Sequence, residues 1–261
     1  MSRSRSSRSL TALAAVAGLF LALPLVGVAV RMPWSDAWSL VSTPAVRQAA
    51  WVSLQTSVLA AVLCVVAGVP LGWWLARAES RLTGTVRSVV ITPMILPPVV
   101  AGIALLSVFG RRGIIGARLF DWWGISIPFT RTAVVLAQVF VSLPFLVLAV
   151  ESSFRQLDRG LEDAARTLGA SPWRVFSTVA LPGARSAVAA GAALAWARSL
   201  GEFGASITFA GSFPGRTQTL PMSIYELVST DYPSALAVSF VMMVVSVVVI
   251  GSLRGRWMVT R

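Results

Sequence analysis

The chain has 261 residues, of which 56% are hydrophobic and 12% are charged, and its formal net charge is +12 at pH 7. It contains no histidine, no lysine and a single cysteine, Cys64. This composition excludes a histidine-dependent catalytic triad, a histidine or multi-cysteine metal site, and a phosphate-binding loop built around lysine. We therefore expect no enzyme active site, no metal and no cofactor on this chain.

Long apolar segments dominate the sequence. Five runs contain no Asp, Glu, Lys or Arg, and each has about the 20 residues that a helix needs to cross a bilayer. A sixth apolar segment, 186–210, is interrupted by Arg198 and Glu202. Because only a helix satisfies its own backbone hydrogen bonds in lipid, we predict one all-α, polytopic membrane domain over 1–261 with six spans. The uninterrupted runs are Ser9–Val30, Gln48–Ala76, Ser88–Gly110, Thr132–Val150 and Tyr232–Leu253.

The N-terminus has the pattern of a signal peptide, with Arg3, Arg5 and Arg8 preceding an apolar run. That run is long for a signal peptide, so we expect a retained first helix; cleavage would leave five spans.

Arginines flank the spans unevenly. With the N-terminus inside, cytoplasmic segments carry twice as many arginines as the opposite side, which predicts that both termini are cytoplasmic. The external loop from Arg111 to Arg131 counts against this orientation because it is arginine-rich. Since the positive charge flanks apolar spans, we assign it to contact with membrane lipid and not to nucleic acid.

Prolines interrupt the third span. Pro93, Pro97 and Pro98 precede Ala101-Gly102 in the chain. A proline lacks a backbone donor and kinks a helix, and the freed carbonyl groups must face protein or a cavity. A kinked third span that lines a central path, with Pro97 and Pro98 at the kink, is one interpretation, and ordinary helix bending is the other.

The segment from about residue 151 to 185 is a polar island between apolar spans. It is far longer than the usual connection between bundled helices, and it is rich in helix-forming Ala, Arg, Glu and Leu. We predict a structured cytoplasmic loop that docks another protein, with Gly169 at the turn between two short helices.

Arg198 and Glu202 lie four residues apart in the fifth span, a spacing that places them on one face of a helix. One interpretation is a self-neutralising ion pair that faces the bundle interior, and the other is a position on the path of a charged solute. The surrounding glycines are explained by close helix packing alone.

The external loop from Gly211 to Pro233 contains a Pro-Gly turn and a possible short helix. Thr219 is a candidate N-cap for a helix that has Pro221 in its first turn and continues through Tyr225. Such a helix would close the path or meet an external binding protein, whereas a plain connector is the alternative.

The 151–185 loop resembles the EAA loop of ABC-importer permeases, the element that the ATPase subunit grips in that family. The acidic residue, two alanines, glycine, aliphatic residue and Leu-Pro of the motif correspond to Asp163-Ala164-Ala165, Gly169, Val179 and Leu181-Pro182. Asp replaces the usual Glu and Val the usual Ile, and the neighbouring Glu162 is an alternative for the acidic role.

Four further segments resemble the permease subunit of molybdate ABC importers, and with the loop they cover most of 48–253. The segments are Leu96–Gly102, Phe109–Gly113, Leu200–Ala205 and Gln218–Tyr225. Sulfate importer permeases share the Leu-Gly-Glu-Phe-Gly motif, and tungstate importers are closer still.

The resemblance implies a type I importer permease of the bacterial plasma membrane. It implies a homodimer of this chain, two ABC ATPase subunits that hold ATP and Mg, and an extracytoplasmic substrate-binding protein. A tetrahedral oxyanion, molybdate first and sulfate or tungstate as alternatives, would cross by alternating access. A secondary transporter or channel without an ATPase is the rival class, and it leaves the 151–185 loop unexplained.

Overall fold

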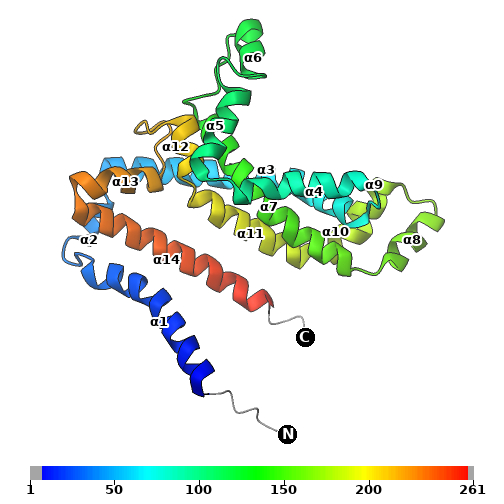
Figure 1. Ribbon diagram of the computed structural model, residues 1–261, viewed down its shortest axis with the longest axis horizontal. Coiled ribbons are helices and arrows are strands. Elements are labelled where there is room, and N and C mark those ends of the chain that lie inside the picture. Colours follow the sequence, from blue (N-terminus) through cyan, green and yellow to red (C-terminus); the bar gives the residue numbers. More distant parts are fainter. Residues whose placement is uncertain (1–7, 258–261) are drawn as a thin grey trace.

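The computed structural model describes residues 8–257, and within that range it is helical and contains no strand (Figure 1). The residues 1–7 and 258–261, on which the predicted position of both termini falls, lie outside the described range. The helices are α1 (Arg8–Arg31), α2 (Ala37–Val41), α3 (Pro44–Arg77), α4 (Arg81–Ile95), α5 (Pro98–Phe109), α6 (Gly116–Trp123), α7 (Arg131–Gln156), α8 (Arg159–Thr167), α9 (Pro172–Val175), the π-helix η1 (Phe176–Ala180), α10 (Leu181–Gly183), α11 (Arg185–Leu200), α12 (Gly204–Ala210), α13 (Leu220–Thr230) and α14 (Tyr232–Trp257).

Four of the described helices are long and apolar enough to cross a membrane: Leu10–Arg31 of α1, all of α3 and α7, and Tyr232–Val249 of α14. A fifth span is present if Pro172–Gly183 and Arg185–Leu200, which meet at 79°, count as one. The prediction of a helical, multi-pass membrane protein is confirmed. Six uninterrupted spans are not observed, because two of the predicted spans are broken.

The first break divides the predicted span Ser88–Gly110. Helix α4 ends at Ile95, and α5 begins at Pro98 after two extended residues. The prolines therefore end one helix and start the next, which is more than the predicted kink. Pro97 and Pro98 are exposed on the surface of the chain.

The second break divides the predicted segment 186–210. Helix α11 ends at Leu200, and α12 begins at Gly204. The two breaks touch, since a Cβ at Gly204 would lie 2.4 Å from Cβ of Pro98. Helices α5 and α12 consequently pack against each other and, with α7, bury a small apolar cluster of their own that includes Ala101 and Phe209.

The main core lies between α3, α7 and α11. Glycines allow the close approach: a Cβ at Gly72 would lie 2.4 Å from Val150, and one at Gly191 would lie 2.8 Å from Leu146. Cys64 is fully buried in this core, and its Sγ faces the carbonyl oxygen of Val139 at 3.9 Å.

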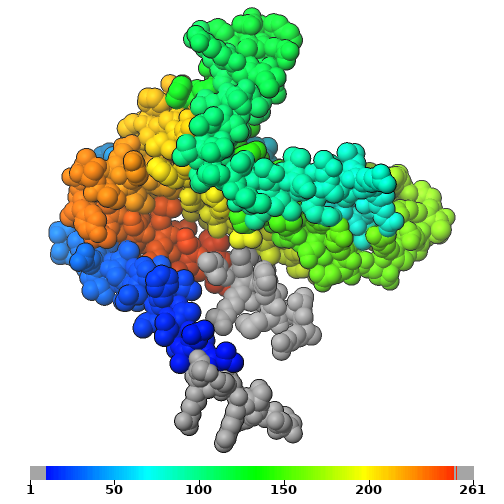
Figure 2. Space-filling model, viewed as in Figure 1, coloured from blue at the N-terminus to red at the C-terminus, as the bar shows by residue number. Residues whose placement is uncertain are grey.

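Two parts of the chain lie away from this core. Helices α5 and α6 project from the long bundle, and α1 diverges from its neighbour α14 towards the N-terminus (Figures 1 and 2). Helix α1 is largely exposed and contacts α14, and Trp34, which follows α1, packs edge-on against Phe240 of α14. These observations do not test whether α1 is retained or cleaved.

Candidate functional site

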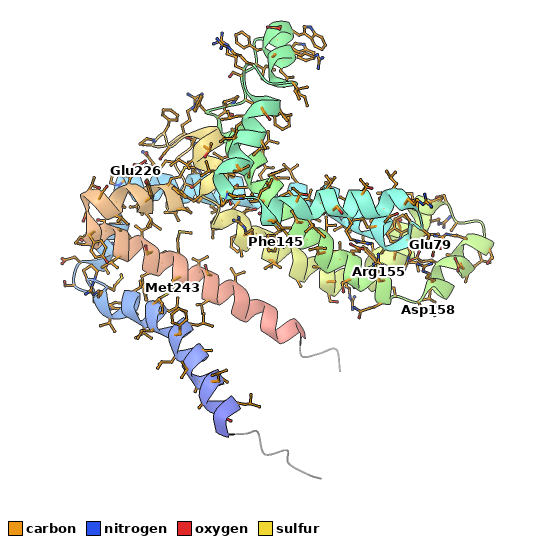
Figure 3. All side chains as sticks on the ribbon, viewed as in Figure 1. Glu79, Phe145, Arg155, Asp158, Glu226 and Met243 are labelled. Atoms are coloured by element: carbon orange, nitrogen blue, oxygen red, sulfur yellow. The ribbon has the colours of Figure 1, made fainter. Side chains whose placement is uncertain are left out.

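The polar loop between α7 and α11 lies at one end of the bundle, where Figure 3 labels Glu79, Arg155 and Asp158. Helix α7 continues to Gln156, so the loop begins six residues later than the predicted residue 151. The loop contains α8, α9, η1 and α10. Local caps explain its first two helices, because Asp158 accepts from N–H of Gly160 at 2.8 Å and Ser171 accepts from N–H of Arg174 at 3.3 Å.

Gly169 forms the turn between α8 and α9, as predicted. Its φ of +84° lies in the left-handed region, and a Cβ built there would meet no atom within 4 Å. The backbone conformation alone therefore favours glycine at this position. The turn is closed by a bond from N–H of Ala170 to the carbonyl of Ala165 at 3.0 Å.

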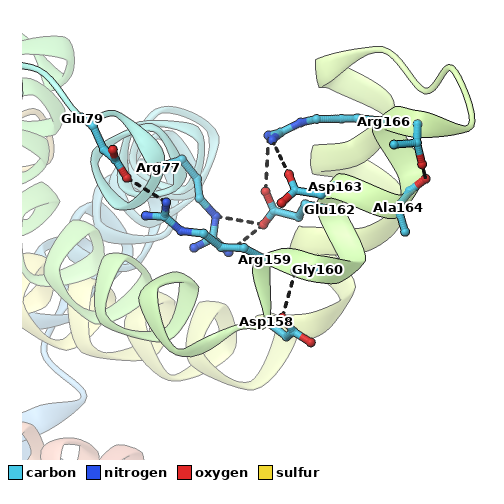
Figure 4. Close-up of polar contacts among 10 residues, drawn as sticks. Arg77, Glu79, Asp158, Arg159, Gly160, Glu162, Asp163, Ala164 and Arg166 are labelled. Carbon is cyan, nitrogen blue, oxygen red and sulfur yellow. Dashed lines mark hydrogen bonds and ion pairs between the residues drawn. The ribbon is translucent and has the colours of Figure 1, made fainter.

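The two neighbouring acids of the loop both lie beside the guanidinium of Arg166 (Figure 4), but they differ in burial. Glu162 is buried, and its Oε1 accepts from Nη2 of Arg77 at 2.7 Å and from Nε at 3.0 Å. Asp163 is exposed, with 64% of its side chain accessible, and it pairs with Arg166 at 3.0 Å. Nη2 of Arg166 also lies 3.6 Å from Oε2 of Glu162, so this arginine connects the two acids.

Apolar side chains of the loop are strongly exposed, as Asp163 is. Leu161 is 63% exposed, Leu168 88% and Trp173 69%. Ala164 is also exposed, Ala165 and Leu181 are half-buried, and Pro182 lies at the surface in α10. We name Leu161, Asp163, Leu168 and Trp173 the loop surface. Exposed apolar groups on an ordered polar loop are typical of a protein-binding site.

The other side of the loop is fixed to the membrane bundle. Phe176, Ala180 and Ala184 are buried in the main core, and the ring of Phe176 lies 5.1 Å from Trp73 of α3 and 5.4 Å from Trp173. An exposed ion pair adds to this attachment: Arg159 donates to Glu79 at 2.8 Å, a hydrogen bond that raises the pKa of Arg159 above its ordinary value.

The sequence analysis did not identify Arg77, Trp73, Leu168 or Trp173 as site residues. Arg77 precedes Glu162 by 85 residues, and no local spacing relates the two. An arginine at the end of an apolar run is interpreted as a membrane-flanking charge. The pattern therefore gives no sign that Arg77 pairs with Glu162.

Arg198 and Glu202 pair at 2.7 Å as predicted, but they do not share a helix, because α11 ends at Leu200. Glu202 is buried, and its other oxygen accepts from N–H of Ala205 at 2.8 Å at the start of α12. The side chain of Arg198 is 33% exposed. The pair therefore bridges the break between α11 and α12.

The short helix predicted after Thr219 is present as α13, with Thr219 at the N-cap position and Pro221 in the first turn. The side chain of Thr219 makes no capping bond; Oγ of Ser53 accepts from N–H of Leu220 at 2.7 Å instead. Tyr225 is exposed, and its ring lies 5.1 Å from that of Phe203, the residue before α12.

A cavity of about 750 Å³ opens between α3 and α7, with a largely apolar lining that includes Trp51, Gln55 and Arg131. It contains neither prolines 97 and 98 nor the Arg198–Glu202 pair, so it does not bring the predicted path residues together. Among the described residues, no group of three or more Cys, Asp or Glu is arranged to hold a metal ion.

Comparison with known proteins agrees with this arrangement. Residues 68–256 match the family model described as binding-protein-dependent transport system inner membrane component. The molybdenum transport system permease protein ModB of Mycobacterium tuberculosis is 48% identical over 91% of this chain and 90% of the relative. The sulfate transport system permease protein CysT of Escherichia coli is 34% identical over 90% of this chain and 86% of the relative.

The fold is likewise similar to a solved structure. The chain superposes on a bacterial alginate ABC transporter in complex with a pentasaccharide-bound periplasmic protein, with a TM-score of 0.72, 15% identity, and 94% and 91% of the two chains covered. Together with the family model and the sequence relatives, the loop at the end of the bundle shows that this chain belongs to the family of binding-protein-dependent transport system inner membrane components.

Proposed function

We propose that this chain is the permease subunit of an ATP-driven importer that carries a tetrahedral oxyanion, molybdate, into the cytoplasm. One observation carries the choice of anion: the chain is 48% identical to a molybdenum permease over nearly its whole length, and 34% identical to a sulfate permease. Sulfate and tungstate are the alternative substrates for an importer permease of this kind.

ATP hydrolysis belongs to a separate ATPase chain, which supplies ATP and Mg. The loop surface supports this assignment, because it presents exposed apolar groups and a carboxylate on a loop whose opposite side is anchored in the core. An ordered docking surface loses little conformational entropy when a partner binds. The loop end of the bundle, with both termini, accordingly lies in the cytoplasm.

The complete transporter contains two copies of this chain, two ATPase subunits and an extracytoplasmic binding protein. ATP binding closes the ATPase dimer and moves the loop surface, and the two permease copies rotate between inward-open and outward-open states. The anion enters from the binding protein while the path is open outward. This mechanism is a population shift between two states driven by differential binding of ATP and of the loaded binding protein.

Reconstitution tests the proposal. The chain is co-expressed with its partner ABC ATPase, purified as a complex and inserted into vesicles with the loaded binding protein outside. We expect ATP-dependent molybdate accumulation that ceases when the ATPase is omitted. Uptake that persists without ATP and the ATPase would favour the rival, an ATP-independent transporter or channel.

A further inference from the structure

The buried ion pair between Arg77 and Glu162 joins the docking loop to a membrane helix. Arg77 is the last residue of α3, the 34-residue helix that runs through the main core. Glu162 is the buried residue of α8, whose other side chains are exposed or half-buried. The side chains of Arg77 and Glu162 are 11% and 3% exposed, so water weakens their attraction very little.

The pair belongs to a chain of charges that ends on the loop surface. Arg77 binds Glu162, Glu162 lies 3.6 Å from Arg166, and Arg166 binds the exposed Asp163 at 3.0 Å (Figure 4). If a docked protein displaces Asp163, Arg166 and Glu162 are therefore displaced with it, and the end of α3 follows.

Helix α3 meets the loop a second time, one helical turn earlier. Trp73 contacts Phe176 of η1, and Phe176 contacts the exposed Trp173. The two contacts come from residues four apart, which lie on the same face of a helix. The last turn of α3 is thus held by α8 through charge and by η1 through aromatic packing.

We propose that Arg77 and Glu162 are positioning residues that transmit movement of the docked loop to α3. The proposal rests on the proposed function, since it requires an ATPase on the loop surface. A closely paired buried guanidinium and carboxylate resist separation, because either group alone would be left without a partner in a low-dielectric site. When α8 moves, α3 follows as a rigid element, and its packing against α7 and α11 carries the movement into the membrane.

The alternative is that the pair only holds the fold together. The two interpretations differ in one measurable quantity, the amount of anion imported for each ATP hydrolysed. A purely structural role predicts parallel losses of assembly, hydrolysis and uptake. A transmitting role predicts that uptake falls while assembly and hydrolysis remain.

The experiment uses the full permease–ATPase complex in vesicles with the loaded binding protein. The variant is Glu162→Gln, which keeps the shape and removes the charge. The matched control is Arg159→Gln, because the Arg159–Glu79 pair joins the same helix α8 to the residues directly after α3 but is exposed on both sides. We expect normal assembly and hydrolysis in both, with molybdate uptake per ATP reduced about tenfold or more in Glu162→Gln alone.

A second variant covers the possibility that Glu162→Gln does not fold. The double variant Arg77→Met/Glu162→Gln leaves no unpaired buried charge and is expected to assemble and to be uncoupled to the same degree. Uptake per ATP equal to that of the unmodified complex, or a loss no larger than that of Arg159→Gln, would overturn the proposal. Loss of assembly in the double variant would also overturn it. Failure of the unmodified chain to bind any ATPase would instead refute the proposed function.

Discussion

Two adjacent carboxylates in the loop between α7 and α11 show how much the burial of a single side chain matters. The motif spacing predicted an acidic group here and left Glu162 and Asp163 as alternatives. The structure separates them, because Glu162 is buried against Arg77 whereas Asp163 is exposed and pairs with Arg166. The direction depends on a partner 85 residues away, so no local pattern contains it.

Gly169 carries a prediction at the same scale. Valine at φ +84° is strained by about 1–2 kcal/mol, whereas asparagine tolerates this conformation well. We expect Gly169→Val to insert normally into the membrane and to lose co-purification with the ATPase, while Gly169→Asn retains most of it. Normal ATPase binding and normal transport by the valine variant would contradict the role of this turn.

The cap of α13 gives a second prediction. The hydroxyl of Ser53 accepts a hydrogen bond from N–H of Leu220, and Ser53→Ala removes it. We expect this variant to lower the free energy of unfolding of the purified protein by about 1 kcal/mol. Thr219→Val is the matched control, since the buried Oγ1 of Thr219 has no hydrogen-bond partner, and this change should be neutral or stabilising. Thermal unfolding in detergent measures both. A larger loss of stability in Thr219→Val than in Ser53→Ala would instead support the predicted capping role of Thr219.

At the scale of whole elements, the apolar runs predicted which segments are helical, but they did not predict where two of these segments break. Hydropathy averages over a window, so it registers 88–110 and 186–210 as spans although Pro98 and Gly204 are the points at which helices restart. The contact between these two residues joins segments that are 106 positions apart, and it becomes evident only in three dimensions. The prolines gave the position of the first break, whereas the signal for the second, Gly201 at the C-cap of α11, was assigned to helix packing.

The Arg198–Glu202 bridge leads to a prediction about the second break. Arg198→Met leaves the buried carboxylate without its cation and should destabilise the protein by about 3 kcal/mol. The double variant Arg198→Met/Glu202→Gln should be less damaged, because the amide keeps an acceptor for N–H of Ala205. Thermal unfolding separates the two variants. If the double variant also imports molybdate at the normal rate, the pair is structural and the anion passes elsewhere.

For the whole molecule, the family and the helical, multi-pass membrane character were accessible from the sequence because they depend on long hydropathy runs and on motif spacing. The position of the anion path was not accessible. Its four candidates, Pro97, Pro98, Arg198 and Glu202, lie near the paired helix breaks, and none of them lines the cavity between α3 and α7. A path formed between two copies has walls that the sequence of one copy does not specify.

The scarcity of charged groups within the membrane predicts weak intrinsic binding of the anion. A conducting path needs sites that release their ion readily, so in the proposed importer the affinity would lie in the binding protein. We expect the purified permease–ATPase complex to bind molybdate poorly, with uptake following the preference of the binding protein for molybdate and tungstate over sulfate. Equilibrium dialysis of the complex and competition uptake assays measure these quantities. Tight binding of molybdate by the permease itself, or preferential sulfate uptake with a molybdate-specific binding protein, would contradict the assignment of affinity and selectivity to the binding protein.

The burial of Cys64 has a practical consequence. Because the lone thiol of the chain is sealed within the main core, aqueous maleimide or methanethiosulfonate reagents should leave the unmodified protein unlabelled. A cysteine introduced at exposed Thr178, which lies in the same loop but outside the loop surface, would then be the single reactive site of each copy. In an assembly with two copies, a spin label there would report one distance between the two docking loops, and that distance would follow their separation through each step of the ATP cycle.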